Sequence, residues 1–192
     1  MLARIPRPLR YLLMGAFVLL TVLTLLPTPP GLSPTARASS PPSVAPPFTQ
    51  TSPEAWINSG PLTWDDLRGQ VVLLDVWTFD CWNCYRSFPW LNSLEARYGD
   101  KGLTVIGIHT PEFRHEHKRP NVEQKVHEFE LHHPIMMDND FGYWNALNNR
   151  YWPAFYLVDK QGRIRGRFIG ETHAGDRNAS AIETQVRELL AE

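Results

Sequence analysis

The sequence lacks unbalanced charge, internal repeats and, almost entirely, cysteine. Its 192 residues include 19 basic and 20 acidic side chains, which gives a formal net charge of -1. This balance leaves no extended positive field to hold a polyanion, so nucleic acid is not an expected partner. Cysteine occurs only twice, which excludes a four-cysteine zinc site. Without repeats, a chain of this length predicts one globular domain with a substantial core.

The N-terminal segment contains no acidic side chain before Glu54 and has the pattern of an export signal. Three arginines precede an uncharged apolar run from Tyr11 to Leu26. The run is longer than a typical signal-peptide core and slightly shorter than the roughly 20 residues that span a bilayer. We expect residues 1–26 to be a signal anchor or a signal peptide, with the anchor favoured over cleavage and over a buried core helix. The rest of the chain is then extracytoplasmic, in the periplasm.

A proline-rich segment follows the apolar run. Nine prolines lie between Pro27 and Pro53, among serine, threonine and alanine. Such a composition supplies few backbone donors and little apolar surface, which predicts a semi-extended linker over residues 27–54. The globular domain is therefore expected over residues 55–192.

Beyond the linker, apolar runs alternate with segments of helical pattern. Strands are expected at 71–76, 103–108, 135–137, 154–158 and 164–169, and helices at 81–98, 122–131, 143–147 and 179–190. The first two strands flank a helix and should pair in parallel, whereas the last two should form an antiparallel hairpin. This order predicts an α/β sandwich around a mixed sheet.

The two cysteines lie where the first buried strand gives way to a helix. At a helix N-terminus, unsatisfied backbone N–H groups stabilise an anion, which lowers a cysteine pKa from about 8.5 to roughly 3.5–7.5. Cys81 is therefore the expected nucleophile. Cys84, one helical turn further on, is placed to attack a mixed disulfide and release the partner.

Other interpretations of this cysteine pair fit the sequence less well. A structural disulfide closing so short a loop would constrain the unfolded chain little. Structural zinc requires further protein ligands, and haem attachment requires histidine where Tyr85 stands. Redox exchange through Cys81 and Cys84 is the interpretation that remains.

The segment around the cysteines resembles the active site of thioredoxin. The matching residues are Asp75, Val76, Trp77, the 81–84 motif and Pro89. Between Cys84 and Pro153 the chain is longer than thioredoxin, and the additional helix and strand resemble the insertion of the TlpA and ResA group. The resemblance implies a thioredoxin-like three-layer α/β/α sandwich with a central mixed sheet and a helix-strand insertion before the cis-proline strand.

A narrower resemblance is to the thioredoxin-like domain of DipZ-type proteins, over residues 56–171. It is carried by Trp77-Thr78, Cys81, Asn83-Cys84, Arg86, Pro89, the 109–113 run, Asp138-Asn139-Asp140, Trp144, Asn149, the 151–154 run and Gly170-Glu171. DipZ-type proteins fuse this domain to a membrane electron transporter, which is absent from this sequence.

The resemblance also implies roles for residues outside the cysteine pair. Asp75 corresponds to the buried acid that assists deprotonation of the second cysteine, and a carboxyl in an apolar strand should have a raised pKa. Its alternative is a strand-end aspartate that faces water. Pro153 corresponds to the family's cis-proline, which would leave the Trp152 backbone free to pair with an extended substrate segment.

Two further site candidates follow from position. Glu112 occupies a place where TlpA and ResA relatives carry an acid, so it is a candidate to tune the cysteines or contact substrate; a solvated loop residue is the alternative. Trp82, between the cysteines, is either an exposed contact for a partner or packs on Trp152. Asp80 adds a negative charge that should oppose part of the helix-end stabilisation of Cys81.

Histidines cluster in two places without further ligands at obvious spacing. We interpret His115-Glu116-His117 and His132-His133 as solvated loop residues, although imidazoles at this spacing can share a metal ion. No metal and no cofactor are expected.

These observations favour a thiol-disulfide oxidoreductase that reduces disulfides in exported proteins, including apocytochromes in cytochrome c biogenesis. The family implies a membrane electron donor of the CcdA or DsbD type. Two alternatives remain: a peroxiredoxin-like thiol peroxidase, in which Cys81 forms a sulfenic acid, and a Sco-like copper chaperone. The absence of a recognisable peroxidase motif and the two-residue cysteine spacing count against them.

Overall fold

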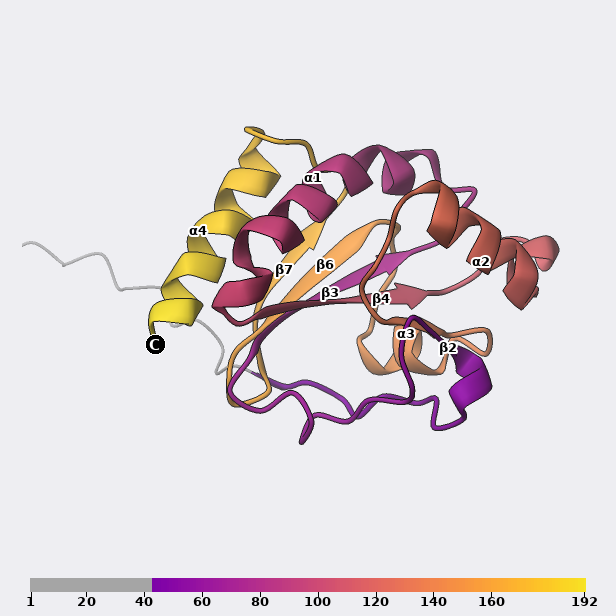
Figure 1. Ribbon diagram of the computed structural model, residues 1–192, viewed down its shortest axis with the longest axis horizontal. Helices are drawn as coiled ribbons and strands as arrows, with labels where there is room; N and C mark the ends of the chain where they lie inside the picture. The colour runs from indigo at the N-terminus through magenta and orange to yellow at the C-terminus, as the bar shows by residue number, and fades with distance from the viewer. Residues whose placement is uncertain (1–42) are drawn as a thin grey trace, which may run out of the picture. The chain divides into compact units, whose positions relative to one another are not determined.

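The computed structural model describes residues 43–192, which form an α/β domain around a seven-stranded mixed sheet (Figure 1). The strand order is β1-β7-β6-β3-β4-β5-β2. The strands are β1 (Ser43–Val44), β2 (Trp56–Ile57), β3 (Val71–Trp77), β4 (Leu103–His109), β5 (Ile135–Met137), β6 (Ala154–Val158) and β7 (Arg163–Ile169). β3 pairs in parallel with β4 and antiparallel with β6, and β6 pairs antiparallel with β7. The predicted parallel unit and C-terminal hairpin are confirmed.

Four α-helices connect these strands. They are α1 (Trp82–Tyr98), α2 (Arg119–Glu128), α3 (Gly142–Ala146) and α4 (Arg177–Ala191), with short 3-10 helices η1 (Pro53–Ala55), η2 (Gly99–Lys101) and η3 (Arg114–His117). α2 begins three residues earlier than predicted because Pro120 lies in its first turn, where proline is favoured. No helix within residues 43–192 is both long and apolar enough to cross a bilayer. The anchor predicted at 11–26 lies outside the described residues.

The alternation of side chains along the sheet divides the core into two layers. Residues 71, 73 and 77 of β3 face a layer that α1, α2 and α4 complete, whereas residues 72, 74 and 76 face a layer that contains α3. In Figure 1, α1 and α4 lie over one face of the sheet and α3 lies beneath the other. The three-layer arrangement is therefore the predicted thioredoxin-like one, and it places β3 and the start of α1 at the centre of the domain.

The folded region begins earlier than the linker boundary predicted at residue 54. β1 pairs antiparallel with β7, and Phe48 is buried against Trp64 and Tyr143. The Trp64 indole and the Tyr143 hydroxyl both donate hydrogen bonds to the Pro46 carbonyl, at 2.7 Å and 3.1 Å. The prediction of a linker was wrong for residues 43–54. Proline lacks a backbone N–H donor but keeps a carbonyl acceptor, and the Pro46 carbonyl is used in this way. The Phe48 ring supplies the apolar surface that the composition did not indicate.

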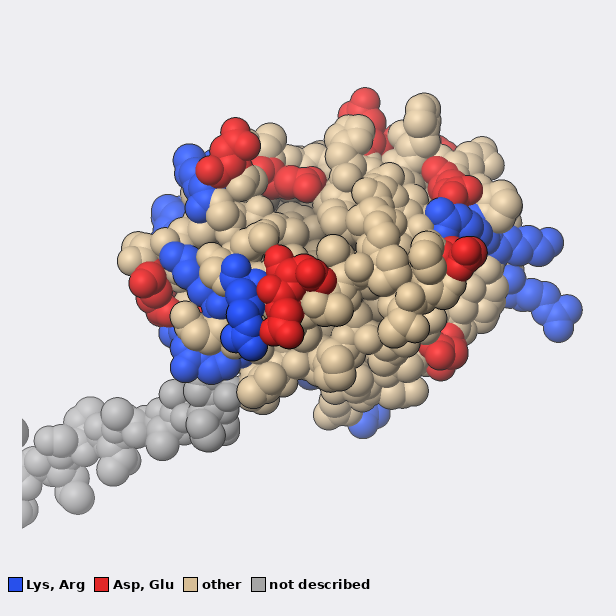
Figure 2. All heavy atoms as spheres, turned by 60° about the horizontal axis from the view of Figure 1, so that its bottom comes forward, with Lys and Arg blue, Asp and Glu red and all other residues tan. Residues whose placement is uncertain are grey.

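This N-terminal segment and α3 lie on the side of the sheet that is at the bottom of Figure 1. Figure 2 brings that side forward and shows charged side chains gathered toward its two ends, with a broad uncharged area between them. The cysteine pair belongs to the opposite layer, with α1. The segment therefore closes one face of the core without covering the start of α1.

Candidate active site

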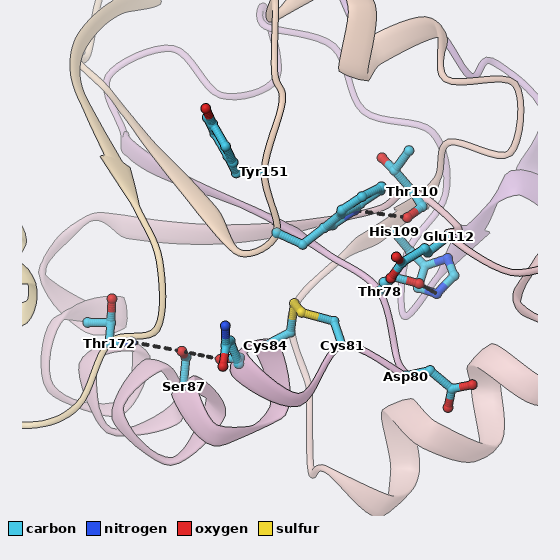
Figure 3. The surroundings of a disulfide bond; sticks show 12 residues. Thr78, Asp80, Cys81, Cys84, Ser87, His109, Thr110, Glu112, Tyr151 and Thr172 are labelled. Carbon is cyan, nitrogen blue, oxygen red and sulfur yellow. Dashed lines mark hydrogen bonds between the residues drawn. A yellow bond between two sulfur atoms is a disulfide. The ribbon is translucent and has the colours of Figure 1, made fainter.

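The two cysteines form a disulfide at the start of α1, with their Cα atoms 5.2 Å apart (Figure 3). Cys81 is the N-cap residue of the helix and is partly exposed, whereas Cys84 is fully buried. Only the first sulfur is therefore accessible to a sulfur of another protein. This difference fits Cys81 as the attacking thiol and Cys84 as the internal resolving thiol.

The backbone at the start of α1 leaves donors available to the first thiol. The N–H groups of Cys84 and Tyr85 donate to the Cys81 carbonyl at 2.9 Å and 3.3 Å. The N–H groups of Trp82 and Asn83 precede these intrahelical bonds and have no partner within the helix. The first turn also carries no acidic residue. A Cys81 thiolate would consequently lie at the positive end of the helix dipole.

Asp75 is buried in the middle of β3, with 1% of its surface exposed. Its position in the strand directs it to the layer that contains Cys84. Neither carboxyl oxygen has a hydrogen-bond partner among the described residues, and burial raises the pKa of Asp75 to about 8. The predicted burial and raised pKa are confirmed. The role of this carboxyl in proton transfer at Cys84 stays a prediction.

The peptide bond between Trp152 and Pro153 is cis, as the family resemblance implies. The Trp152 indole donates a hydrogen bond of 3.1 Å to the Thr110 carbonyl, and its ring lies 4.2 Å from that of Trp144. These contacts fix the segment before β6. Its role in substrate pairing is not tested by them.

Trp82 extends from the start of α1 into solvent, with 61% of its surface exposed. Its ring meets Tyr85 edge to face at 5.1 Å, and the Arg86 guanidinium lies 5.7 Å from the ring centroid. Among the described aromatic pairs, Trp152 packs on Trp144 rather than on Trp82. The exposed-contact interpretation is thus the one that the geometry supports. Tyr151, labelled in Figure 3, is a second exposed aromatic residue near the disulfide.

Besides Asp75, the structure buries a second acidic residue near the start of α1, and it is Glu116 rather than Glu112. The Glu112 side chain is exposed, whereas Glu116 is fully buried. The Glu116 carboxylate accepts four hydrogen bonds: from the Thr78 hydroxyl at 2.6 Å and from the backbone N–H groups of Asp80, Glu112 and Phe113 at 3.0, 2.6 and 2.6 Å. Its assignment as a solvated loop residue was wrong, because tertiary donors replace water around it.

The histidines also differ from the sequence-based interpretation. His133 is 2% exposed, and its Nδ1 lies 3.2 Å from the Glu95 carboxylate, so it is a core residue rather than a solvated one. His115 is exposed and pairs with Asp80. His109, which the sequence did not single out, is fully buried at the end of β4. Within residues 43–192 no three histidine, cysteine or acidic side chains are grouped as metal ligands would be.

Comparison with known proteins places this geometry among thiol-disulfide oxidoreductases. The chain is 41% identical over 138 residues to Protein DipZ of Mycobacterium bovis, a match that covers 70% of this chain and 19% of DipZ. It is 29% identical over 143 residues to the thiol-disulfide oxidoreductase YkuV of Bacillus subtilis, covering 74% of this chain and 92% of YkuV. The chain thus spans about a fifth of the length of the DipZ relative.

The fold is shared with solved structures. A thiol-disulfide isomerase from Corynebacterium glutamicum superposes with a TM-score of 0.64 at 22% identity, over 77% of this chain and 97% of that protein. The model of the AhpC/TSA family matches residues 42–167, which is more than half of the sequence and includes both cysteines and the cis-proline. The chain therefore belongs to the AhpC/TSA family and carries a thioredoxin-like domain.

Proposed function

We propose that this protein is a thiol-disulfide oxidoreductase that reduces disulfides in exported proteins. The observation that carries the proposal is the Cys81–Cys84 disulfide at the N-terminus of α1, with one sulfur accessible and the other buried. The name of the relative YkuV, a thiol-disulfide oxidoreductase, supports the same chemistry. The cis-proline and the exposed Trp82 supply surfaces on which a substrate segment can lie beside the pair.

The reaction begins from the reduced dithiol. The Cys81 thiolate attacks one sulfur of a substrate disulfide, which forms a mixed disulfide and releases the other substrate sulfur as a thiolate that takes up a proton. Cys84 then passes its proton to the ionised form of Asp75, which a pKa of about 8 leaves as a minority near neutral pH, and the Cys84 thiolate attacks the Cys81 sulfur. The mixed disulfide breaks, the second substrate thiol leaves with a proton, and the enzyme becomes the disulfide seen in Figure 3. The dithiol supplies the two electrons that the substrate gains; of the two protons, one comes from Cys84 by way of Asp75 and the other from water.

The setting of this reaction follows from the N-terminal sequence. An anchor at residues 11–26 would hold the domain at the outer face of the cytoplasmic membrane, in the periplasm, where exported proteins acquire disulfides. A dithiol donor in the membrane, of the CcdA or DsbD type, would return electrons to the oxidised pair after each turnover. Apocytochromes awaiting haem attachment are one class of substrate that requires reduced cysteines.

Reduction of insulin disulfides by the chain that starts at residue 43 tests this function. With dithiothreitol as electron source, we expect catalysed reduction by the wild-type protein and none by Cys81→Ser. When it is reduced first and freed of dithiothreitol, Cys84→Ser should instead accumulate a stable mixed disulfide with insulin, because no resolving thiol remains. An active Cys81→Ser protein would falsify the assignment of roles.

The same preparation separates the proposal from its two alternatives. A peroxidase would consume hydrogen peroxide faster than it reduces insulin, with a sulfenic acid at Cys81. A copper chaperone would retain one Cu(I) ion per reduced protein against a competing chelator. We expect neither behaviour.

A further inference from the structure

Glu116 joins the two loops that border the accessible cysteine. Its Oε1 accepts from the Thr78 hydroxyl and the Asp80 N–H, which belong to the turn between β3 and α1. Its Oε2 accepts from the N–H groups of Glu112 and Phe113, which follow β4. One carboxylate thus fixes the residue that precedes the Cys81 N-cap against the neighbouring loop, with each oxygen serving one side.

This carboxylate is charged although it is buried. Burial by itself would raise the pKa of Glu116, but the hydrogen bonds from Thr78 and from three backbone N–H groups outweigh it and hold the pKa below its usual range. None of the ion pairs within residues 43–192 includes Glu116. Its negative charge is therefore offset by dipoles alone.

The nearest buried imidazole does not neutralise it. Thr78 gives its single hydroxyl hydrogen to Glu116, so its oxygen can only accept from His109 Nε2, which lies 3.4 Å away. His109 then carries its hydrogen on Nε2, and its Nδ1 is left as a bare nitrogen without a partner among the described residues. Burial lowers the pKa of His109 to about 4 despite the opposing effect of Glu116, so the ring is neutral at pH 7.

Figure 3 shows where these groups lie. Thr78 and His109 are beside Cys81, whereas Ser87 and Thr172 lie on the other side of the disulfide, beside Cys84. The hydrogen-bond chain from Glu116 reaches the backbone of the accessible cysteine through Thr78, whose carbonyl accepts from the Cys81 N–H at 3.3 Å. A negative charge close to a thiol disfavours the thiolate, and the burial of Glu116 reduces the screening of its charge by solvent.

We propose that Glu116 is a positioning residue for the disulfide reaction: through Thr78 and the Asp80 N–H it holds Cys81 at the end of α1 and makes its thiolate less stable, which makes the disulfide more reducing. This role rests on the proposed function and favours one direction of electron transfer, from the dithiol to the substrate. A destabilised thiolate disfavours the reduced form and so favours transfer of electrons to a substrate.

Other charged groups near Cys81 act from solvent. Asp80, His115 and Glu112 are exposed, so water screens them more strongly than the buried anion. Asp75 faces the layer of Cys84 and is largely protonated at neutral pH because of its raised pKa. All four groups are unchanged when Glu116 is neutralised, which isolates the effect of that one charge.

Glu116→Gln tests the proposal by two measurements on the chain from residue 43: the rate of Cys81 alkylation across a pH series, and the reduction potential against glutathione. Removing the anion should lower the pKa of the Cys81 thiol by about one unit. At pH values below that pKa, alkylation should therefore be about tenfold faster. The reduction potential should move in the oxidising direction. Glu188→Gln, a control at an exposed glutamate of α4 that has no part in the site, should change neither quantity.

Thr78→Val keeps the test decisive if Glu116→Gln does not fold. Loss of the hydroxyl donor leaves the carboxylate less compensated, so alkylation of Cys81 should slow about threefold, equivalent to roughly half a pKa unit. Thr78→Ser should restore the wild-type rate. Changes of opposite sign in the Cys81 alkylation rate of Glu116→Gln and Thr78→Val support the proposal. Changes of the same sign, or no change, would mean that Glu116 has only a structural role.

Neither measurement needs a protein substrate, which separates this proposal from the proposed function. If the variants shift as expected but the wild-type protein does not reduce insulin, the role of Glu116 stands and the proposed function fails. If insulin is reduced and the variants do not shift, the function stands and the role of Glu116 is overturned.

Discussion

Asp75 and Glu116 are both buried carboxyl groups near the disulfide, yet Asp75 is largely neutral and Glu116 is ionised. Asp75 has no hydrogen-bond partner among the described residues, and its pKa is raised to about 8. Glu116 has four donors, and its pKa is lowered. Burial is common to the two sites, so the number of donors supplied by the fold decides which carboxyl is ionised.

The difference matches the needs of the two sulfurs. Cys84 is buried and must gain and lose a proton within the protein, and Asp75, with a pKa near neutrality, can exchange one there. Cys81 is accessible and exchanges protons with water, so it needs no proton acceptor within the protein. A nearby fixed charge can instead change the stability of its thiolate. Glu116 provides such a charge and fixes the loop geometry as well.

The largest effect on this contrast should come from Asp75→Asn. The resolving step should slow about hundredfold, at the lower end of the usual contribution of acid-base catalysis, because Cys84 loses its proton acceptor. Stopped-flow measurement of mixed-disulfide decay reports this step, and alkylation of Cys81 in the same variant should stay near the wild-type rate. Equal slowing of both steps would mean that Asp75 acts on the whole site rather than on Cys84.

A smaller effect should be seen in the pH dependence of stability, measured by urea unfolding of the oxidised protein. Asp75 is protonated in the folded state up to about pH 8 but only to about pH 4 when unfolded, so its contribution is lost as pH rises. His109, with its pKa lowered to about 4, has the opposite dependence below about pH 6.5. We therefore expect nearly constant stability from pH 4 to 6.5, then a loss of up to about 1.4 kcal/mol per pH unit to pH 8.

Asp75→Leu is the matched variant for that measurement, because it keeps the number and branching of the side-chain heavy atoms and removes the titrating group. The decline above pH 6.5 should disappear, and stability should instead fall as pH drops toward 4, where His109 acts alone. An unchanged decline above pH 6.5 in the variant would assign it to another group and contradict a neutral Asp75.

The sequence predicted the parts of the site that local patterns encode. The β3 apolar run identified a covered strand, and burial with a raised pKa was the favoured prediction for the aspartate within it, over a strand-end aspartate that faces water. The cysteine pair at the strand-helix junction predicted the redox centre, and the family resemblance predicted the cis bond before Pro153.

The sequence could not reveal what depends on contacts between distant segments. Glu116 lies in a polar run, and its donors Thr78 and Asp80 are more than 30 residues away, so its neighbours in sequence indicated a solvated loop. One local signal existed: Glu116 bonds back to the Phe113 N–H three residues earlier, as the glutamate of a capping box does, but no serine or threonine marked that box. Burial of Phe48 depends likewise on Trp64 and Tyr143.

Thiol titration of the reduced protein, followed separately at Cys81 and Cys84 by alkylation and mass spectrometry, tests the central claim most directly. The accessible thiol at the helix end should react as a thiolate well below pH 8.5, and the buried thiol should resist ionisation to higher pH because burial disfavours its charged form. Two cysteines that titrate together near 8.5, as free cysteine does, would contradict the account.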